Sequence, residues 1–272
     1  MNIVNILEEI EKVDGEVYER LNPRRAAMKS FVNMGKKVSL AAVPLALGSM
    51  FQKAYGQTLP TAVKDVLNFA LTLEYLEYHF YNHAVLAAPG LLSGAALTAI
   101  STIRDHELAH VNLLKGALGA TDARPALAYT DFDFTAGGTF GDVYTNYNTF
   151  LAVAQAFEDT GVRAYKGQAG VLKGLDVLTT ALQIHSVEAR HAAHIRTMRG
   201  QKPWITLGAG GVANDTGIAA VDAVYAGENE EMQTGVTITG IATGVTKAAA
   251  VESFDEPLDK AKVLVIAGLF IR

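Results

Sequence analysis

The pattern that most constrains the fold is a glutamate followed three residues later by a histidine, and it occurs twice. Glu107 and His110 form one copy, in D-H-E-L-A-H, and Glu188 and His191 form the other, in S-V-E-A-R-H-A-A-H. Positions i and i+3 of an α-helix lie on one face, so each carboxylate projects beside its imidazole. A single copy arises by chance in many chains. Two copies in helix-forming surroundings predict one shared interior site.

Each copy follows a predicted helix that supplies a further glutamate. Glu74 precedes the first copy and Glu158 precedes the second. Two helical turns later each glutamate is followed by a tyrosine on the same face, Tyr81 after Glu74 and Tyr165 after Glu158. The chain therefore contains two weakly similar helical hairpins, each offering a glutamate and then Glu-x-x-His.

Apolar periodicity bounded by Pro and Gly predicts four long helices. They cover about residues 61–87, 93–118, 143–168 and 175–199. The first and third connections are short, which favours antiparallel neighbours, but residues 119–142 can run the length of a bundle. We therefore predict an all-α four-helix bundle at residues 57–203, with a long crossover between its second and third helices.

The N-terminal region, residues 1–56, is predicted to contain an amphipathic helix over 2–20 and then a targeting-like segment. Arg24 and Arg25, a following lysine and the apolar run 38–51 resemble a twin-arginine export signal. That apolar run is too short to cross a membrane. We expect a periplasmic or otherwise exported protein. The alternative is a buried N-terminal helix that is never removed, in a cytoplasmic protein.

The C-terminal extension, residues 204–272, differs in composition from the bundle. Residues 205–245 are rich in Gly, Thr, Val and Ala, which predicts a loop with a short strand or helix. Helices are predicted near 245–253 and over 258–271. The extension is too apolar for a free linker, so we expect it to pack on the bundle or on another subunit.

The residue types limit the chemistry of a shared site. The 272 residues include no cysteine, so any transition-metal site must use His, Asp and Glu. Carboxylates with one imidazole per ion suit iron or manganese, whereas structural zinc sites prefer sulfur and nitrogen. We predict a carboxylate-bridged centre of two Fe or two Mn ions. Its predicted metal ligands are Glu74, Glu107, His110, Glu158, Glu188 and His191.

Two segments resemble a known group of proteins. L-N-F-A-L-T-L-E-Y-L-E (67–77) and E-S-F-D-E-P-L-D-K (252–260) resemble bacterial ferritin-like proteins often labelled desiccation-related. More broadly, residues 60–200 resemble the ferritin-like superfamily, which includes ferritins, rubrerythrins and manganese catalases. The resemblance implies a ferritin-like bundle with the same six metal ligands. It implies a fold more clearly than a reaction, because the narrower relatives have no well-defined activity.

Several neighbouring residues compete for roles. Glu77 lies one turn after Glu74 and could replace it as a ligand. His185 is a candidate extra ligand, and His106 and His194 flank the predicted site. The remaining candidates are Asp105 and Asp159 as carboxylates behind a ligating histidine, and Tyr81 and Tyr165 as hydrogen-bond donors, electron relays or ordinary core aromatics.

Three functional hypotheses follow from these residues. The first is a redox metalloprotein that activates O2 or disposes of H2O2, by ferroxidase, peroxidase or manganese-catalase-like chemistry, in oxidative or desiccation stress. The second is a non-catalytic, structural or stress-protective scaffold. The third is an iron-storage cage, which the long flanking segments disfavour. We expect a homo-oligomer with an external electron donor. The net charge of −5 and the lack of a basic stripe argue against nucleic acid.

Overall fold

A computed structural model describes residues 59–208 and 219–272. The amphipathic helix and twin-arginine-like segment predicted within residues 1–56 lie outside the described residues. In the described ranges, no helix combines the length and the apolar character that a membrane crossing requires.

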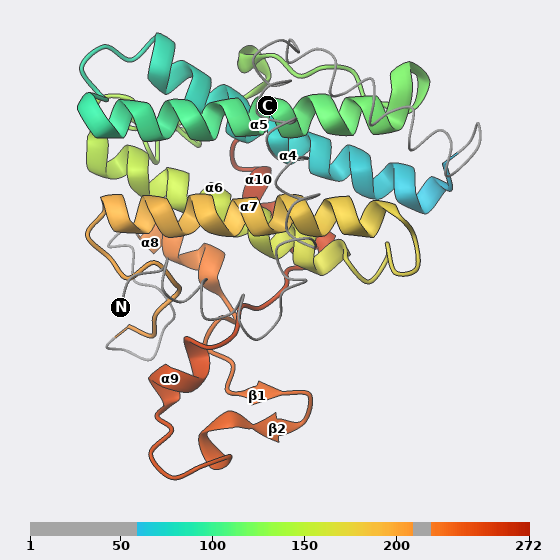
Figure 1. Ribbon diagram of the computed structural model, residues 1–272. Helices are drawn as coiled ribbons and strands as arrows, with labels where there is room; N and C mark the ends of the chain where they lie inside the picture. The colour runs from blue at the N-terminus through green and yellow to red at the C-terminus, as the bar shows by residue number, and fades with distance from the viewer. Residues whose placement is uncertain (1–58, 209–218) are drawn as a thin grey trace, which may run out of the picture. The chain divides into compact units, whose positions relative to one another are not determined.

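Four long helices form the described core, so the prediction of an all-α four-helix bundle is confirmed. They are α4 (Thr61–Leu86), α5 (Gly94–Asp122), α6 (Tyr147–Gln168) and α7 (Val177–Met198). Helix α4 packs along α5, and α6 packs along α7, as Figure 1 shows. Short connections join the helices within each pair, so each pair is an antiparallel hairpin.

Two helix ends differ slightly from the prediction, each for a local reason. Helix α6 begins later than expected because Asn146 caps it, its side chain accepting a hydrogen bond from the backbone N–H of Asn148 at 3.0 Å. Helix α5 continues to Asp122, but Gly119 interrupts it with φ +73°. Glycine tolerates this left-handed conformation at little cost, so the regular helix does end where the sequence predicts.

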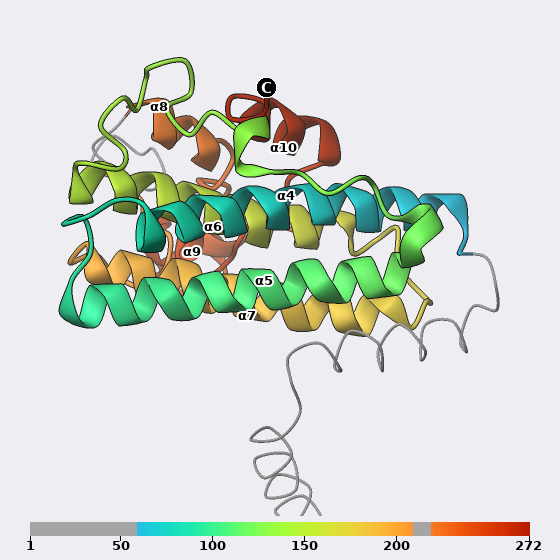
Figure 2. The ribbon, with the colours of Figure 1, turned by 90° about the horizontal axis from the view of Figure 1, so that it is seen from above.

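The connection between α5 and α6 runs along the bundle from one end to the other, as Figure 2 shows. It contains the short 3₁₀ helix η1 (Tyr129–Asp131). Aromatic and polar contacts hold it against α4. The Leu127 carbonyl lies 2.8 Å from His79 Nε2, and the Tyr129 ring stacks on His83 with centroids 4.5 Å apart. This segment is thus the long ordered crossover that the sequence predicts.

The C-terminal extension contains short elements. They are α8 (Ala219–Asp222), η2 (Ala223–Tyr225), η3 (Ile238–Gly240), α9 (Lys247–Val251), α10 (Lys260–Ala267) and an antiparallel pair of strands, β1 (Met232–Gln233) and β2 (Val236–Thr237). Helix α10 is shorter than predicted. Asp259 caps its start by accepting from the Lys262 N–H, and beyond its end Ile271 pairs with Phe132 of the crossover.

Contacts with this extension explain why α6 is buried on almost every side. Arg163 of α6 is only 1% exposed and pairs with Glu228 at 2.8 Å. The same guanidinium donates to the backbone carbonyls of Val224, Ala226 and Glu256. Helix α6 therefore packs against the other bundle helices on one side and against the extension on the other.

Candidate metal centre

The bundle brings all six predicted ligands to its centre. Each hairpin contributes one glutamate from its first helix and a Glu-x-x-His pair from its second. The ligand atoms form two groups, each within 4.8 Å: Glu74, Glu107, His110 and Glu188 in one, and Glu107, Glu158, Glu188 and His191 in the other. Glu107 and Glu188 belong to both groups, so the arrangement is two adjacent sites that share two carboxylates.

At the first group, one imidazole nitrogen faces three carboxylates. His110 Nδ1 lies 3.1 Å from Glu74 Oε2, 3.0 Å from Glu107 Oε2 and 3.1 Å from Glu188 Oε1. A ring nitrogen carries at most one proton, so it cannot donate to all three oxygens. Neighbouring ligands of an octahedral cation with bonds of about 2.1 Å stand about 3.0 Å apart. The spacings therefore match those of ligands around one small cation.

The second group repeats this arrangement. His191 Nδ1 lies 2.9 Å from Glu107 Oε1, 3.1 Å from Glu158 Oε2 and 3.7 Å from Glu188 Oε2. Glu107 and Glu188 thus each turn one oxygen toward His110 and the other toward His191. This is the disposition that a carboxylate adopts when it bridges two cations.

The cluster buries more negative charge than its own hydrogen bonds satisfy. The four glutamates Glu74, Glu107, Glu158 and Glu188 are all 0% exposed. Within the described part of the chain, Glu107 Oε1 and both Glu188 oxygens have no hydrogen-bond donor beside them other than the two imidazole nitrogens, which already face other carboxylates. A buried carboxylate without a partner costs several kcal/mol in folding free energy. Two divalent cations would offset four carboxylate charges, so the donor set fits a pair of metal ions.

In the metal-free protein, protons occupy this cluster. Burial raises the pKa of Glu74 to about 8 and holds the pKa of Glu158 well above its usual value. Burial alone would lower the pKa of His110 and His191, but the facing carboxylates outweigh it and raise both. Metal ions must therefore displace protons when they bind.

Two tyrosines orient the outer glutamates, Glu74 and Glu158, which each belong to only one ligand group. Tyr165 donates to Glu74 Oε1 and Tyr81 donates to Glu158 Oε1, each at 2.5 Å. In both cases the other oxygen of the carboxylate faces a histidine. Burial and the facing carboxylate raise the pKa of both tyrosines well above the usual value, so both remain donors. These tyrosines are therefore part of the site, not only aromatic packing.

The competing carboxylate, Glu77, is buried beside the cluster but belongs to neither group. Its pKa is raised well above the usual value by burial and by the neighbouring Glu188. Gly161 makes room for it, because a Cβ at this position would lie 3.2 Å from Glu77 Oε1. Gly161 was not among the residues predicted to shape the site, although a glycine inside a helical run is a usable signal.

The other residues predicted near the site have different partners from those that the sequence suggests. The proposal that Asp105 or Asp159 supports a ligating histidine is wrong, because they pair with Arg104 and Arg196 respectively. Instead, His106 Nδ1 lies 2.9 Å from His191 Nε2. Two other candidate histidines, the half-buried His185 and the exposed His194, join neither ligand group.

An antiparallel four-helix bundle that buries a carboxylate and histidine cluster defines a class of protein suited to hold two metal ions. Residues 62–201 match the family model described as a ferritin-like domain, a span that covers just over half of the chain. The chain therefore belongs to the ferritin-like domain family. It has no significant match among curated proteins or solved structures.

Proposed function

We propose that the cluster binds two ions of iron or manganese and that the protein uses them to react with O2 or H2O2. The observation that carries the proposal is the pair of imidazole nitrogens, each facing three carboxylate oxygens, with Glu107 and Glu188 shared between them. Glu74 and His110 would hold one ion, and Glu158 and His191 the other.

The donor set favours these metals. Six ligands dominated by carboxylate oxygen, with one imidazole per ion, suit Fe and Mn better than metals that prefer sulfur or nitrogen. When bound, such ions supply redox chemistry toward the O–O bond. The residues of the chain hold and orient the ions: Tyr81 and Tyr165 fix the outer carboxylates, and the surrounding apolar side chains exclude water.

Metal analysis of the purified full-length protein tests this proposal. We expect two ions per chain, and their loss in a variant carrying Glu107→Ala and Glu188→Ala. Asp105→Ala, on the exposed face of α5, is the matched control and should retain both ions. H2O2 and O2 consumption and Fe(II) oxidation then separate catalase-like, peroxidase and ferroxidase chemistry. A wild-type protein with no metal and no turnover would contradict the proposal.

The wider setting of this activity is also proposed. We infer a role in oxidative or desiccation stress. The electron donor would be another molecule, because the chain has no cysteine for a resident iron–sulfur or rubredoxin-type centre. The twin-arginine-like segment supports a periplasmic or exported protein. Replacing Arg24 and Arg25 with lysine should then abolish export of a fused reporter.

Exposed apolar side chains support a homo-oligomer. In and just beyond α10, Leu264, Val265 and Leu269 are 43%, 73% and 57% exposed. Burial of such side chains between subunits would remove apolar surface from water. Light scattering tests this, and a hollow 24-subunit particle would instead indicate an iron-storage cage.

A non-catalytic, stress-protective scaffold is the second candidate function. It is favoured by the buried ion pair between Arg163 of α6 and Glu228, which fastens the C-terminal extension to the bundle. The two functions are separable by the same double variant. If Glu107→Ala plus Glu188→Ala leaves the metal content unchanged, the cluster is not the metal centre and the scaffold function is preferred.

A further inference from the structure

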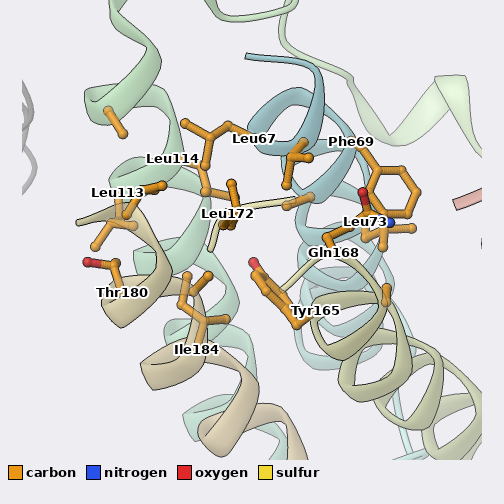
Figure 3. Close-up of a pocket in the computed structure, with 16 residues that line it drawn as sticks. Leu67, Phe69, Leu73, Leu113, Leu114, Tyr165, Gln168, Leu172, Thr180 and Ile184 are labelled. Carbon is orange, nitrogen blue, oxygen red and sulfur yellow. The ribbon is translucent and has the colours of Figure 1, made fainter. Parts of the chain in front are cut away.

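A small apolar cavity that is not fully enclosed extends from Tyr165, beside the candidate metal centre, to the loop that joins α6 to α7. Figure 3 shows side chains from all four long helices around it, with Leu172 of that loop among them. Its volume is about 20 Å³. Such a space exceeds the roughly 10–15 Å³ that one water-sized molecule needs, but is far smaller than the ~150 Å³ cavity that binds benzene.

The lining selects an apolar occupant. It consists mostly of aliphatic side chains, including Leu67, Leu114 and Ile184. Its polar side chains are Tyr165, Gln168 and Thr180, and the Tyr165 hydroxyl already donates to Glu74. A buried water needs two to four polar partners, and H2O2 also loses hydrogen bonds in such a space. A diatomic gas loses none.

The cavity shares a wall with the metal centre. The ring of Tyr165 lines the cavity, and its hydroxyl lies 2.5 Å from Glu74 Oε1. Leu73, the residue before Glu74, also lines it, and Ile184 lies one helical turn before Glu188. A molecule in the cavity is therefore separated from the cluster by little more than one side chain.

We propose that this cavity is a binding site for O2, which it holds beside the metal centre. The proposal rests on the proposed function and narrows it, because the cavity concentrates O2 but gives no advantage to H2O2. Its basis is the combination of apolar lining, a volume suited to a diatomic molecule and the wall shared through Tyr165.

Xenon binding to the metal-free full chain, followed by ¹²⁹Xe NMR, tests the site without any turnover. Ala117 of α5 lines the cavity and is 7% exposed, so Ala117→Leu should fill the space and lower xenon affinity about tenfold or more. Ala109→Leu, the same substitution at an exposed position of α5, should leave xenon binding unchanged. Circular dichroism checks that each variant is folded.

A second variant keeps the test decisive if Ala117→Leu fails to fold. Leu172→Ala enlarges the cavity and should increase xenon uptake. A folded Ala117→Leu protein that binds xenon like the wild type, or a folded Leu172→Ala protein with unchanged uptake, overturns the assignment of the site.

Kinetics of the metal-loaded protein test the role. In Ala117→Leu the apparent KM for O2 should rise about tenfold, while H2O2 consumption stays within about twofold of the wild type. An unchanged KM for O2 in the folded variant overturns the role of the cavity. Absence of metal from the wild type contradicts the proposed function, and with it the role, whereas the xenon result still decides whether the cavity binds a gas.

Discussion

Tyr165 on α6 donates a hydrogen bond to Glu74 on α4, with 2.5 Å between the hydroxyl and Oε1. This bond joins the two hairpins directly at the candidate metal centre. Because Oε1 is engaged, only Oε2 of Glu74 is directed at His110. The tyrosine thereby sets which carboxylate oxygen is offered to a cation.

Removal of this hydroxyl should weaken metal binding without unfolding the bundle. In Tyr165→Phe the carboxylate of Glu74 loses its orienting donor, and we expect metal affinity to fall about 10- to 100-fold. Competition with a chelator measures this affinity. Tyr81→Phe should have the same effect through Glu158. Tyr147→Phe, which is remote from the cluster, is the control, and an equal loss in that variant would contradict the explanation.

The shared and outer glutamates should differ in metal stoichiometry. Glu107 lies in both ligand groups, whereas Glu74 lies in one. We expect Glu107→Gln to reduce the occupancy of both ions, and Glu74→Gln to reduce chiefly the ion held by His110. Elemental analysis of the purified variants measures the difference. Identical stoichiometry in the two variants would show that the carboxylates are not divided in this way.

The stability of the metal-free protein should fall as pH rises from about 5 to 8.5. Burial raises the pKa of Glu74 to about 8, and the facing carboxylates raise the pKa of His110 and His191. In this pH range the folded state holds more protons than the unfolded state, so the free energy of unfolding decreases with pH.

Chemical denaturation at several pH values measures this trend. Metal should stabilise the protein increasingly over the same range, because fewer protons then compete for the ligands. A free energy of unfolding that rises with pH in the metal-free protein would show that the cluster is not protonated as described.

A side chain at position 161 should be destabilising while Glu77 occupies its present position. A Cβ at 161 would lie 3.2 Å from Glu77 Oε1 and 3.7 Å from Glu188 Cγ. Gly161→Ala should therefore lower the free energy of unfolding by about 1–3 kcal/mol, despite the better helix propensity of alanine. Gly170→Ala, with no atom within 4 Å of the added Cβ, is the control.

A double variant identifies the cause of that cost. If contact with the carboxylate is responsible, Gly161→Ala should cost much less in a Glu77→Ala background, and the two effects should be strongly non-additive. Additive effects, measured by urea denaturation, would mean that Gly161 is constrained by something other than Glu77.

The buried Arg163 should be essential for docking of the C-terminal extension. Arg163→Met leaves Glu228 buried without its partner, which should cost about 3–5 kcal/mol. Proteolysis should then cleave residues 219–272 before the bundle. Arg190→Met, at an exposed position of α7, should leave the cleavage pattern unchanged. Protection of the extension in Arg163→Met would contradict this role.

Helical periodicity explains which features could be predicted. The spacing of Glu107 and His110, or of Glu188 and His191, follows from a period of 3.6 residues, so each pair can be placed on one face without knowing the fold. Glycine and proline mark the helix ends in the same local way. The long crossover follows because its length excludes a tight turn.

Contacts between helices could not be predicted in this way. The approach of His106 to His191 depends on how α5 and α7 cross, and a sequence carries no local signal of a crossing angle. The same holds for Asp159, whose partner Arg196 was not anticipated. The cavity beside Tyr165 results from small differences in packing among many side chains, which no pattern of residue types specifies.

The equal contributions of the two hairpins also bear on how such a centre could arise. Each hairpin supplies one outer glutamate, one shared glutamate and one histidine, and Glu107 and Glu188 occupy equivalent places. Each hairpin of the bundle thus encodes half of the ligand set. A single ancestral hairpin that paired with its own copy would already present a complete set, before duplication and fusion joined the two in one polypeptide.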